Sequence, residues 1–261
     1  MKLYYKENGI TLIRGDCLEV MDKLINKNIK FDAIITDPPY GTTQCKWDSV
    51  IPLDEMWKRL NLLKNNTVPV VLFASQPFTS LLVSSNISNF KYDWVWKKPK
   101  GTGHLNAKKQ PMRDKEDIIV FYEKQCMYNP QWSWGEPYSN LKSGKTAKKS
   151  EAEVSGKYMN GAEYRNGSDG RRYPKQILEF GVVERGTVHP TQKPIDLMEY
   201  LIKTYTKEGD SILDFTCGSG TTLIAAKNTN RKAVGIELEE KYCEISKNRL
   251  EENNNKIITN Q

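Results

Sequence analysis

The segment Asp37–Tyr40, Asp-Pro-Pro-Tyr, carries the side chains of this protein best suited to chemistry. It follows the short apolar run Ala33–Ile35, so we expect it to form a loop at the end of a strand. The Asp37 carboxylate can accept a hydrogen bond from an amine, and the Tyr40 ring can stack on a flat ring. The two prolines fix the backbone and offer no competing N–H group. The segment therefore predicts a site that binds a flat ring with an amine group.

A second candidate site is a glycine-rich turn, Cys217–Gly220, between a predicted strand and a predicted helix. Glycines let the backbone approach a ligand at the N-terminus of the helix. The turn is not a phosphate-binding loop, because no Gly-Lys-Ser/Thr follows, and Leu223 replaces the third glycine of the dinucleotide fingerprint. Glu237 ends the next predicted strand, where a carboxylate can accept hydrogen bonds from both ribose hydroxyls. The spacing favours a nucleoside site over a tight turn with a surface glutamate.

Two further segments place polar side chains near predicted strand ends. Within His189–Pro194, Thr191 and Lys193 can bind an anionic group such as a carboxylate. Asp16 follows the first predicted strand and can cap the next helix. Taken alone, Asp16 is better explained by this structural role.

The positive charge of the chain is concentrated in its middle third. The net charge is +7, and residues 97–185 contain 18 basic and 11 acidic residues, which accounts for the whole excess. A basic region in an otherwise neutral chain suggests that the protein binds a polyanion such as nucleic acid. A basic surface that only keeps the protein in solution explains the charge equally well.

Several protein classes are disfavoured by the residues that are scarce. The five cysteines form no CxxC pair and there are only two histidines, which argues against a disulfide framework, a zinc site and metal catalysis. No apolar run reaches the roughly 18 residues of a membrane span. We therefore expect a soluble cytoplasmic protein that uses no metal.

The apolar periodicity predicts alternating strands and helices, as in an α/β protein. Strands are predicted at 11–14, 31–36, 68–74, 92–96, 118–122, 211–214 and 233–236, and helices at 18–25, 53–63, 195–205, 221–227 and 239–250. Residues 97–117 are predicted to form a mobile basic loop, and 125–187 an irregular insertion with interleaved Trp and Tyr. The Asn-rich tail from Glu251 is expected to fray.

In the order of their motifs, these segments resemble the β group of DNA amino methyltransferases, in which the catalytic motif precedes the cofactor motif. The resemblance spans nearly the whole chain. It implies a Rossmann-like methyltransferase fold with a mixed, mostly parallel sheet, helices on both faces and an irregular target-recognition insertion. Residues 1–124 would be the catalytic half of the domain, 125–187 the insertion and 188–261 the cofactor-binding half.

The resemblance also implies the site residues and the cofactor, S-adenosylmethionine. The catalytic residues would be Asp37, Pro38, Pro39 and Tyr40. The cofactor-binding residues would be Asp16, Thr36, His189, Thr191, Lys193, Asp214, Phe215, Thr216, Gly218, Ser219, Gly220, Thr221 and Glu237. Among these, Asp16 would lie near the cofactor's adenine amine, Glu237 on its ribose, and His189–Pro194 over its carboxylate. Thr216 stands where the family usually has phenylalanine, which leaves open whether Phe215 or Thr216 lines the pocket.

The expected reaction depends on positioning rather than on a covalent intermediate. The lone pair of an exocyclic amine is delocalised into its ring, and acceptors on its N–H groups return that density to nitrogen. The Asp37 carboxylate and the Pro38 carbonyl would be these acceptors. In the family, an aspartate at the first position of the Asp-Pro-Pro-Tyr motif usually accompanies methylation of adenine, and a serine there more often accompanies methylation of cytosine N4. We therefore expect transfer to adenine N6. The alternatives are cytosine N4 and a DNA-binding protein without activity. Cytosine C5 chemistry is disfavoured, because no cysteine follows a proline.

The implied partner is double-stranded DNA from which the target base is flipped out. Basic residues are candidates for phosphate contacts, although a solvated surface role is favoured for any one of them: Lys108, Lys109, Lys148, Lys149, Arg171 and Arg172. Relatives often form homodimers. The resemblance leaves open a partner restriction endonuclease in a restriction-modification system and a phage origin, and it implies no membrane partner.

Overall fold

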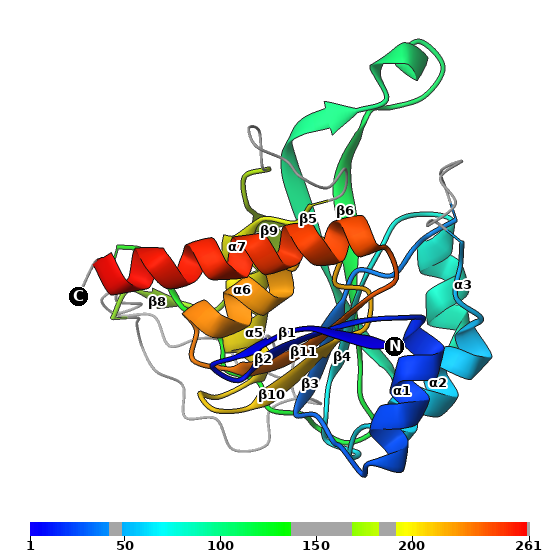
Figure 1. Cartoon of the computed structure of the whole chain (residues 1–261). Coiled ribbons are helices and arrows are strands. Elements are labelled where there is room, and N and C mark those ends of the chain that lie inside the picture. Colours follow the sequence, from blue (N-terminus) through cyan, green and yellow to red (C-terminus); the bar gives the residue numbers. More distant parts are fainter. Residues whose placement is uncertain (42–48, 137–168, 183–191, 260–261) are drawn as a thin grey trace. The chain divides into compact units, whose positions relative to one another are not determined.

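A nine-stranded sheet forms the centre of the computed structural model, which describes residues 1–41, 49–136, 169–182 and 192–259 (Figure 1). The strand order is β1-β2-β11-β10-β3-β4-β6-β5-β9. These strands are β1 (Lys2–Glu7), β2 (Ile10–Arg14), β3 (Ala33–Thr36), β4 (Val70–Ala74), β5 (Phe90–Thr102), β6 (Arg113–Phe121), β9 (Ile177–Glu179), β10 (Ser211–Asp214) and β11 (Lys232–Glu237). The chain divides into one unit of Met1–Asn129 with Lys175–Gln261, which holds this sheet, and a second unit, Pro130–Pro174.

The sheet is mixed and mostly parallel, as predicted. The five central strands β2, β11, β10, β3 and β4 are parallel to one another, whereas β1 and β6 pair antiparallel with the strands beside them. Strand β9 then pairs parallel with β5. All four residues of β3 are buried, which is the pattern of a strand covered on both sides.

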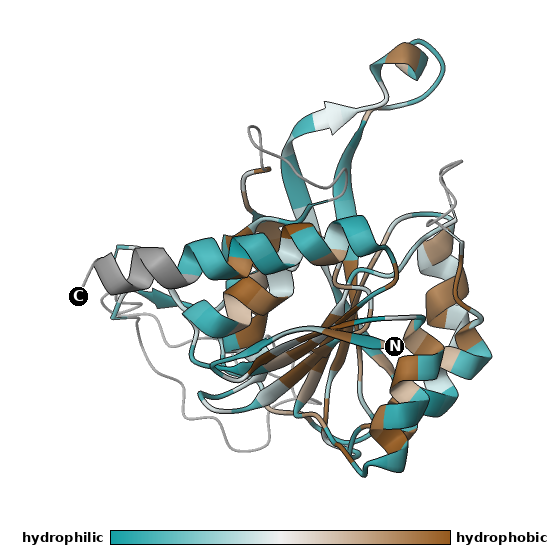
Figure 2. Cartoon of the chain, viewed as in Figure 1, coloured by the Kyte–Doolittle hydropathy of each residue, from teal (hydrophilic) through white to brown (hydrophobic). Residues whose placement is uncertain are grey.

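Helices cover both faces of this sheet, which confirms the expected architecture (Figure 1). The helices are α1 (Cys17–Asn26), α2 (Leu53–Leu62), α3 (Phe78–Ser85), α5 (Ile195–Tyr205), α6 (Thr221–Asn228) and α7 (Glu240–Thr259). Successive strand residues face opposite sides, so Ala33 and Ile35 join the apolar cluster of α5, α6 and α7, while Ile34 joins that of α1, α2 and α3. Figure 2 shows the apolar strands between these helix layers. Among the described residues, no helix has the length and apolar character that a membrane span needs.

The prediction of a mobile loop at residues 97–117 is wrong, because β5 and β6 continue there as a hairpin. Lys97 pairs with Lys115 and Thr102 with Arg113, and a short 3-10 helix, η1 (His104–Asn106), lies at the tip. We call residues 97–115 the β5–β6 arm, and Figure 1 shows it projecting beyond the sheet. Nearly all its side chains are exposed, so no apolar alternation marks the strands although the ladder continues.

Four further elements of the first unit differ from the sequence prediction. Strands β1 and β9 and helix α3 were not predicted, and β9 falls within the stretch expected to be irregular. Helix α7 continues to Thr259, so the expected fraying from Glu251 is wrong for the backbone. Short strands and a polar helix end carry too little apolar pattern to be identified from sequence.

The second unit contains a small antiparallel pair, β7 (Ser133–Trp134) and β8 (Arg171–Arg172). The rings of Trp132 and Tyr173 lie 4.2 Å apart between centroids, and the Arg171 guanidinium stacks over Trp132. The unit lies inside the predicted target-recognition insertion, whose role stays a prediction.

Candidate active site

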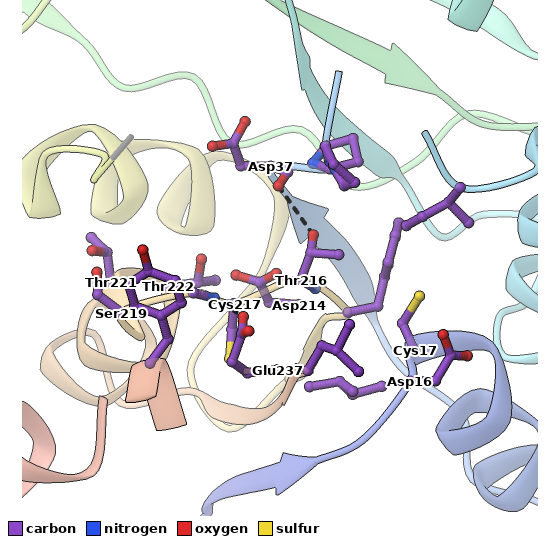
Figure 3. Close-up of a pocket in the computed structure, with 18 of the residues that line it drawn as sticks. Asp16, Cys17, Asp37, Asp214, Thr216, Cys217, Ser219, Thr221, Thr222 and Glu237 are labelled. Atoms are coloured by element: carbon purple, nitrogen blue, oxygen red, sulfur yellow. Dashed lines mark hydrogen bonds between the residues drawn. The ribbon is translucent and has the colours of Figure 1, made fainter. Parts of the chain in front are cut away.

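Four carboxylates lie at the carboxyl ends of four adjacent parallel strands. Asp16 follows β2, Glu237 ends β11, Asp214 ends β10 and Asp37 follows β3. Ligands of α/β proteins bind at this edge of the sheet, because the loops leaving the strands form a crevice there. The four side chains line one pocket of about 390 Å³ (Figure 3). The order of the strands thus determines the order of the charges along the pocket.

Glu237 fixes the glycine-rich turn through backbone hydrogen bonds at one end of this pocket. Glu237 Oε2 accepts a hydrogen bond from Gly218 N at 3.0 Å, and Oε1 accepts one from Glu239 N at 2.7 Å. Each carboxylate oxygen has a second acceptor position, so the side chain can also accept bonds from a diol. Gly220 has φ of 78°, and a Cβ on it would lie 2.0 Å from Ser246 Oγ, so the turn requires glycine at this position.

Asp16 is an N-cap, as the sequence predicted. Its Oδ1 accepts hydrogen bonds from Leu18 N at 2.9 Å and Glu19 N at 3.1 Å, which satisfies two N–H groups at the start of α1. The same residue lies in the short connection between β2 and α1 and lines the pocket. The structural role is confirmed, and contact with the cofactor's adenine stays a prediction.

Asp214 lies at the base of a hydrogen-bond network beneath the pocket. It is 3% exposed, and burial raises its pKa to about 6 although hydrogen bonds oppose the shift. Thr36 Oγ1 donates to Asp214 Oδ1 at 2.5 Å, and Thr216 N donates to the same oxygen at 3.1 Å. Phe215 and Thr216 both line the pocket, and which of them contacts the cofactor stays a prediction. Thr36 lies behind the pocket wall and supports it.

Asp37 and Tyr40 form the other end of the pocket. The Tyr40 hydroxyl donates to Asp37 Oδ1 at 2.5 Å, while its ring stacks on Phe78 of α3 with centroids 5.4 Å apart. Burial and the neighbouring Asp37 charge raise the pKa of Tyr40 well above its usual value, so the phenol stays a donor. Burial also raises the pKa of Asp37. A buried carboxylate with a raised pKa is a better proton acceptor than an exposed one.

Lys193 and Glu116 complete the surroundings of Asp37. Lys193 Nζ lies 2.5 Å from Asp37 Oδ2 and 3.2 Å from Glu116 Oε2. Glu116 on β6 was not a predicted site residue, because it fell in the stretch expected to be a basic loop. Phe78 was missed because α3 was not predicted.

The pocket collects most of the predicted site residues. Its walls include Pro38, Pro39, Tyr40, Lys193, Phe215, Thr216, Gly218, Ser219 and Thr221, in addition to the four carboxylates at the strand ends. Gly220 shapes the turn without lining the pocket. His189, Thr191, Lys148 and Lys149 lie outside the described residues. Lys108 and Lys109 are exposed on the β5–β6 arm, and Arg171 and Arg172 belong to the second unit. Among the described residues, no three His, Cys, Asp or Glu side chains could hold a metal ion.

Comparison with known proteins identifies the kind of fold to which this pocket belongs. The model of a family described as DNA methylase matches residues 31–248. The chain is 26% identical to the type II methyltransferase M2.DpnII of Streptococcus pneumoniae, over 97% of this chain and 94% of the relative. It is 30% identical to the type II methyltransferase M.BglII of Bacillus subtilis, over 96% of this chain and 72% of the relative.

Comparison with solved structures finds the same fold. A crystal structure of the M1.HpyAVI-SAM complex matches with a TM-score of 0.63 and 27% identity, covering 92% of this chain and 98% of that one. The cytosine-N4-specific PvuII DNA methyltransferase matches with a TM-score of 0.66 but only 16% identity, covering 95% and 88%. The second match concerns the fold alone.

Proposed function

This chain belongs to the DNA methylase family, and from that premise we propose that it methylates adenine N6 at a specific site in double-stranded DNA. The observation that carries the proposal is the position of Asp37 at one end of a pocket whose other end holds Glu237 and the glycine-rich turn. An acceptor for an exocyclic amine and a cradle for a nucleoside cofactor therefore share one cavity. The aspartate at the first position of the catalytic segment favours adenine over cytosine.

S-adenosylmethionine is the cofactor of this family, and it supplies an electrophilic methyl group when it is bound. The residues of the pocket fit it. Glu237, with both oxygens oriented by backbone N–H groups, would accept the ribose hydroxyls. Asp16, at the neighbouring strand end, would take the adenine amine, and the turn at Gly218–Thr221 would hold the methionine end.

In this proposal, Asp37 is the residue that activates the target amine. Its carboxylate accepts an N–H of the target amine and keeps the lone pair on nitrogen, and the Pro38 carbonyl accepts the second N–H. Because burial raises its pKa, Asp37 can also take the proton that the methylated amine releases. The Tyr40 ring, supported from behind by Phe78, provides a flat surface for the flipped base.

The β5–β6 arm is the element of the first unit that we assign to DNA contact. Ala74, the last residue of β4, pairs with Asp117, so the preceding residues of β6 extend past the pocket edge of the sheet. The exposed basic side chains of the arm include Lys97, Lys100, Lys108, Lys109, Arg113 and Lys115. A basic arm beside the pocket can hold phosphates while the base is flipped.

Sequencing with detection of modified bases tests this function directly. The protein is expressed in a host without DNA methylation, and the genome is then sequenced. N6-methyladenine at one recurring sequence is the expected result. N4-methylcytosine would overturn the choice of base and leave the family chemistry intact, whereas unmodified DNA with a folded, cofactor-binding protein would support a DNA-binding role without activity. The same data report the recognition sequence.

A further inference from the structure

A row of alternating charges leads from the base of the β5–β6 arm to the catalytic carboxylate. Lys98 Nζ lies 2.5 Å from Glu116 Oε1, Glu116 Oε2 lies 3.2 Å from Lys193 Nζ, and Lys193 reaches Asp37 Oδ2. The four residues come from β5, β6, the segment before α5 and the loop after β3. Side chains so far apart in sequence form a row only if the fold brings these segments together.

Burial makes this row costly to disrupt. The Lys193 side chain is 7% exposed and that of Glu116 is 14% exposed, so water screens them poorly. Burial opposes the charged form of Lys193, but Asp37 and Glu116 outweigh it and raise the pKa of the ammonium. Burial likewise opposes the charge on Glu116, and Lys193 and Lys98 hold its pKa below the usual value. Each charge therefore depends on the next one in the row.

We propose that Lys193 and Glu116 are positioning residues for methyl transfer: Glu116 anchors the Lys193 ammonium, and Lys193 holds Asp37 by Oδ2 so that Oδ1 faces the target amine. This inference rests on the proposed function. It also gives Lys193 a different task from the one implied by the family resemblance. The ammonium already contacts two protein carboxylates, and a cofactor carboxylate would add a third anion to it.

The arrangement specifies what the target amine meets on entering the pocket. Oδ2 of Asp37 is engaged by Lys193, while Oδ1 receives the Tyr40 hydroxyl. A neutral hydroxyl is easier to displace than a buried ammonium held by two anions. The amine therefore shares or replaces the Tyr40 bond at Oδ1, and the Lys193 contact persists during the reaction.

Three variants separate this role from cofactor binding. Lys193→Gln removes the charge, Lys193→Arg keeps it, and Glu116→Gln removes only the anchor. Titration calorimetry gives the dissociation constant for S-adenosylmethionine, carbon NMR of the labelled Asp37 carboxyl gives its titration without DNA, and steady-state kinetics gives kcat against pH.

Lys193→Gln is expected to lower kcat by about a hundredfold, because a misplaced catalytic group costs on that order. Its cofactor affinity should stay within about twofold of the wild-type value. The groups that face Asp37 are Tyr40, Lys193, Glu116 and Asp214, and Lys193 is the cation among them. Its removal should shift the Asp37 titration and the acidic limb of kcat to higher pH. Lys193→Arg should restore part of kcat and part of the wild-type Asp37 titration. Glu116→Gln should lower kcat and leave the cofactor affinity unchanged.

The opposite pattern would overturn the inference. If Lys193→Gln weakens cofactor binding about tenfold or more and leaves the Asp37 titration unchanged, Lys193 serves the cofactor. Circular dichroism verifies folding, and if Lys193→Gln does not fold, Glu116→Gln decides alone by the same readouts. Wild-type protein that methylates no DNA would reject the proposed function, whereas the NMR titration would still test the pairing of Lys193 with Asp37.

Discussion

The Thr216 hydroxyl donates a hydrogen bond to the backbone carbonyl of Asp37 at 3.1 Å (Figure 3). This contact joins the residue before the glycine-rich turn to the segment Asp37–Tyr40. The same hydroxyl lies 2.7 Å from Thr36 Oγ1, which donates in turn to Asp214. The residue that departs from the usual phenylalanine of the family therefore links the two ends of the pocket through its hydroxyl.

Replacing Thr216 tests whether this link matters for catalysis. Thr216→Val keeps the shape and removes the hydroxyl. We expect kcat to fall by roughly fivefold, since a lost hydrogen bond of about 1 kcal/mol displaces Asp37. Thr216→Ser keeps the hydroxyl and should retain most of the activity. Equal kcat values for the two variants would show that the hydroxyl has no role. Steady-state kinetics on unmethylated DNA that contains the recognition site provides the measurement.

Asp37→Ala should abolish methyl transfer and leave cofactor binding intact. The substitution removes the acceptor for the target amine, while Glu237 and the turn at the other end of the pocket are unchanged. Transfer of labelled methyl groups to DNA measures the activity, and calorimetry measures cofactor affinity. Asp37→Asn is the matched variant, because it retains the shape but neither the charge nor the proton acceptor. Full activity in either variant would reject the mechanism.

Asp214 should make the stability of the protein depend on pH. Burial raises its pKa from 3.8 to about 6, so the folded protein keeps a proton that the unfolded chain releases. Between these two values the free energy of unfolding should therefore fall as pH rises, by on the order of 3 kcal/mol. Urea unfolding from pH 4 to 7 of the wild type and of Asp214→Asn measures this, because the asparagine variant lacks the titration. Parallel curves for the two proteins would contradict the prediction.

The two lysines near the tip of the β5–β6 arm should contribute to DNA affinity and not to cofactor affinity. Replacing Lys108 and Lys109 with alanine should weaken DNA binding and reduce the slope of log K against log salt by up to roughly 2, one unit for each lost phosphate contact. The matched control replaces Lys23 and Lys27 at the end of α1, which is remote from the pocket edge, and removes the same charge. Fluorescence anisotropy at several salt concentrations makes the comparison. If the two double replacements weaken DNA binding equally, the overall positive charge of the protein attracts DNA and the arm makes no direct contact.

The strand ends of this fold could be predicted from sequence, because each buried strand is a short apolar run and each is followed by a polar residue. Asp37 and Glu237 were found in this way, and they line one pocket with Asp214, which the family resemblance implied. The β5–β6 arm could not be found, since its exposed strands carry no alternation. Glu116 and the Thr216 hydroxyl became visible only when their partners from distant segments were placed beside them.

The interleaved strand order has a consequence for how the protein is made. Strands β11 and β10, from the last part of the chain, lie between β2 and β3, from the first part. While the chain is still emerging from the ribosome, β10 and β11 have not yet been made. The space between β2 and β3 is then empty, and the two halves of the pocket are not yet connected. The pocket can therefore be complete only after β10 and β11 have both taken their places between β2 and β3. A chain broken between the two halves would need its fragments to reassemble before any DNA could be modified.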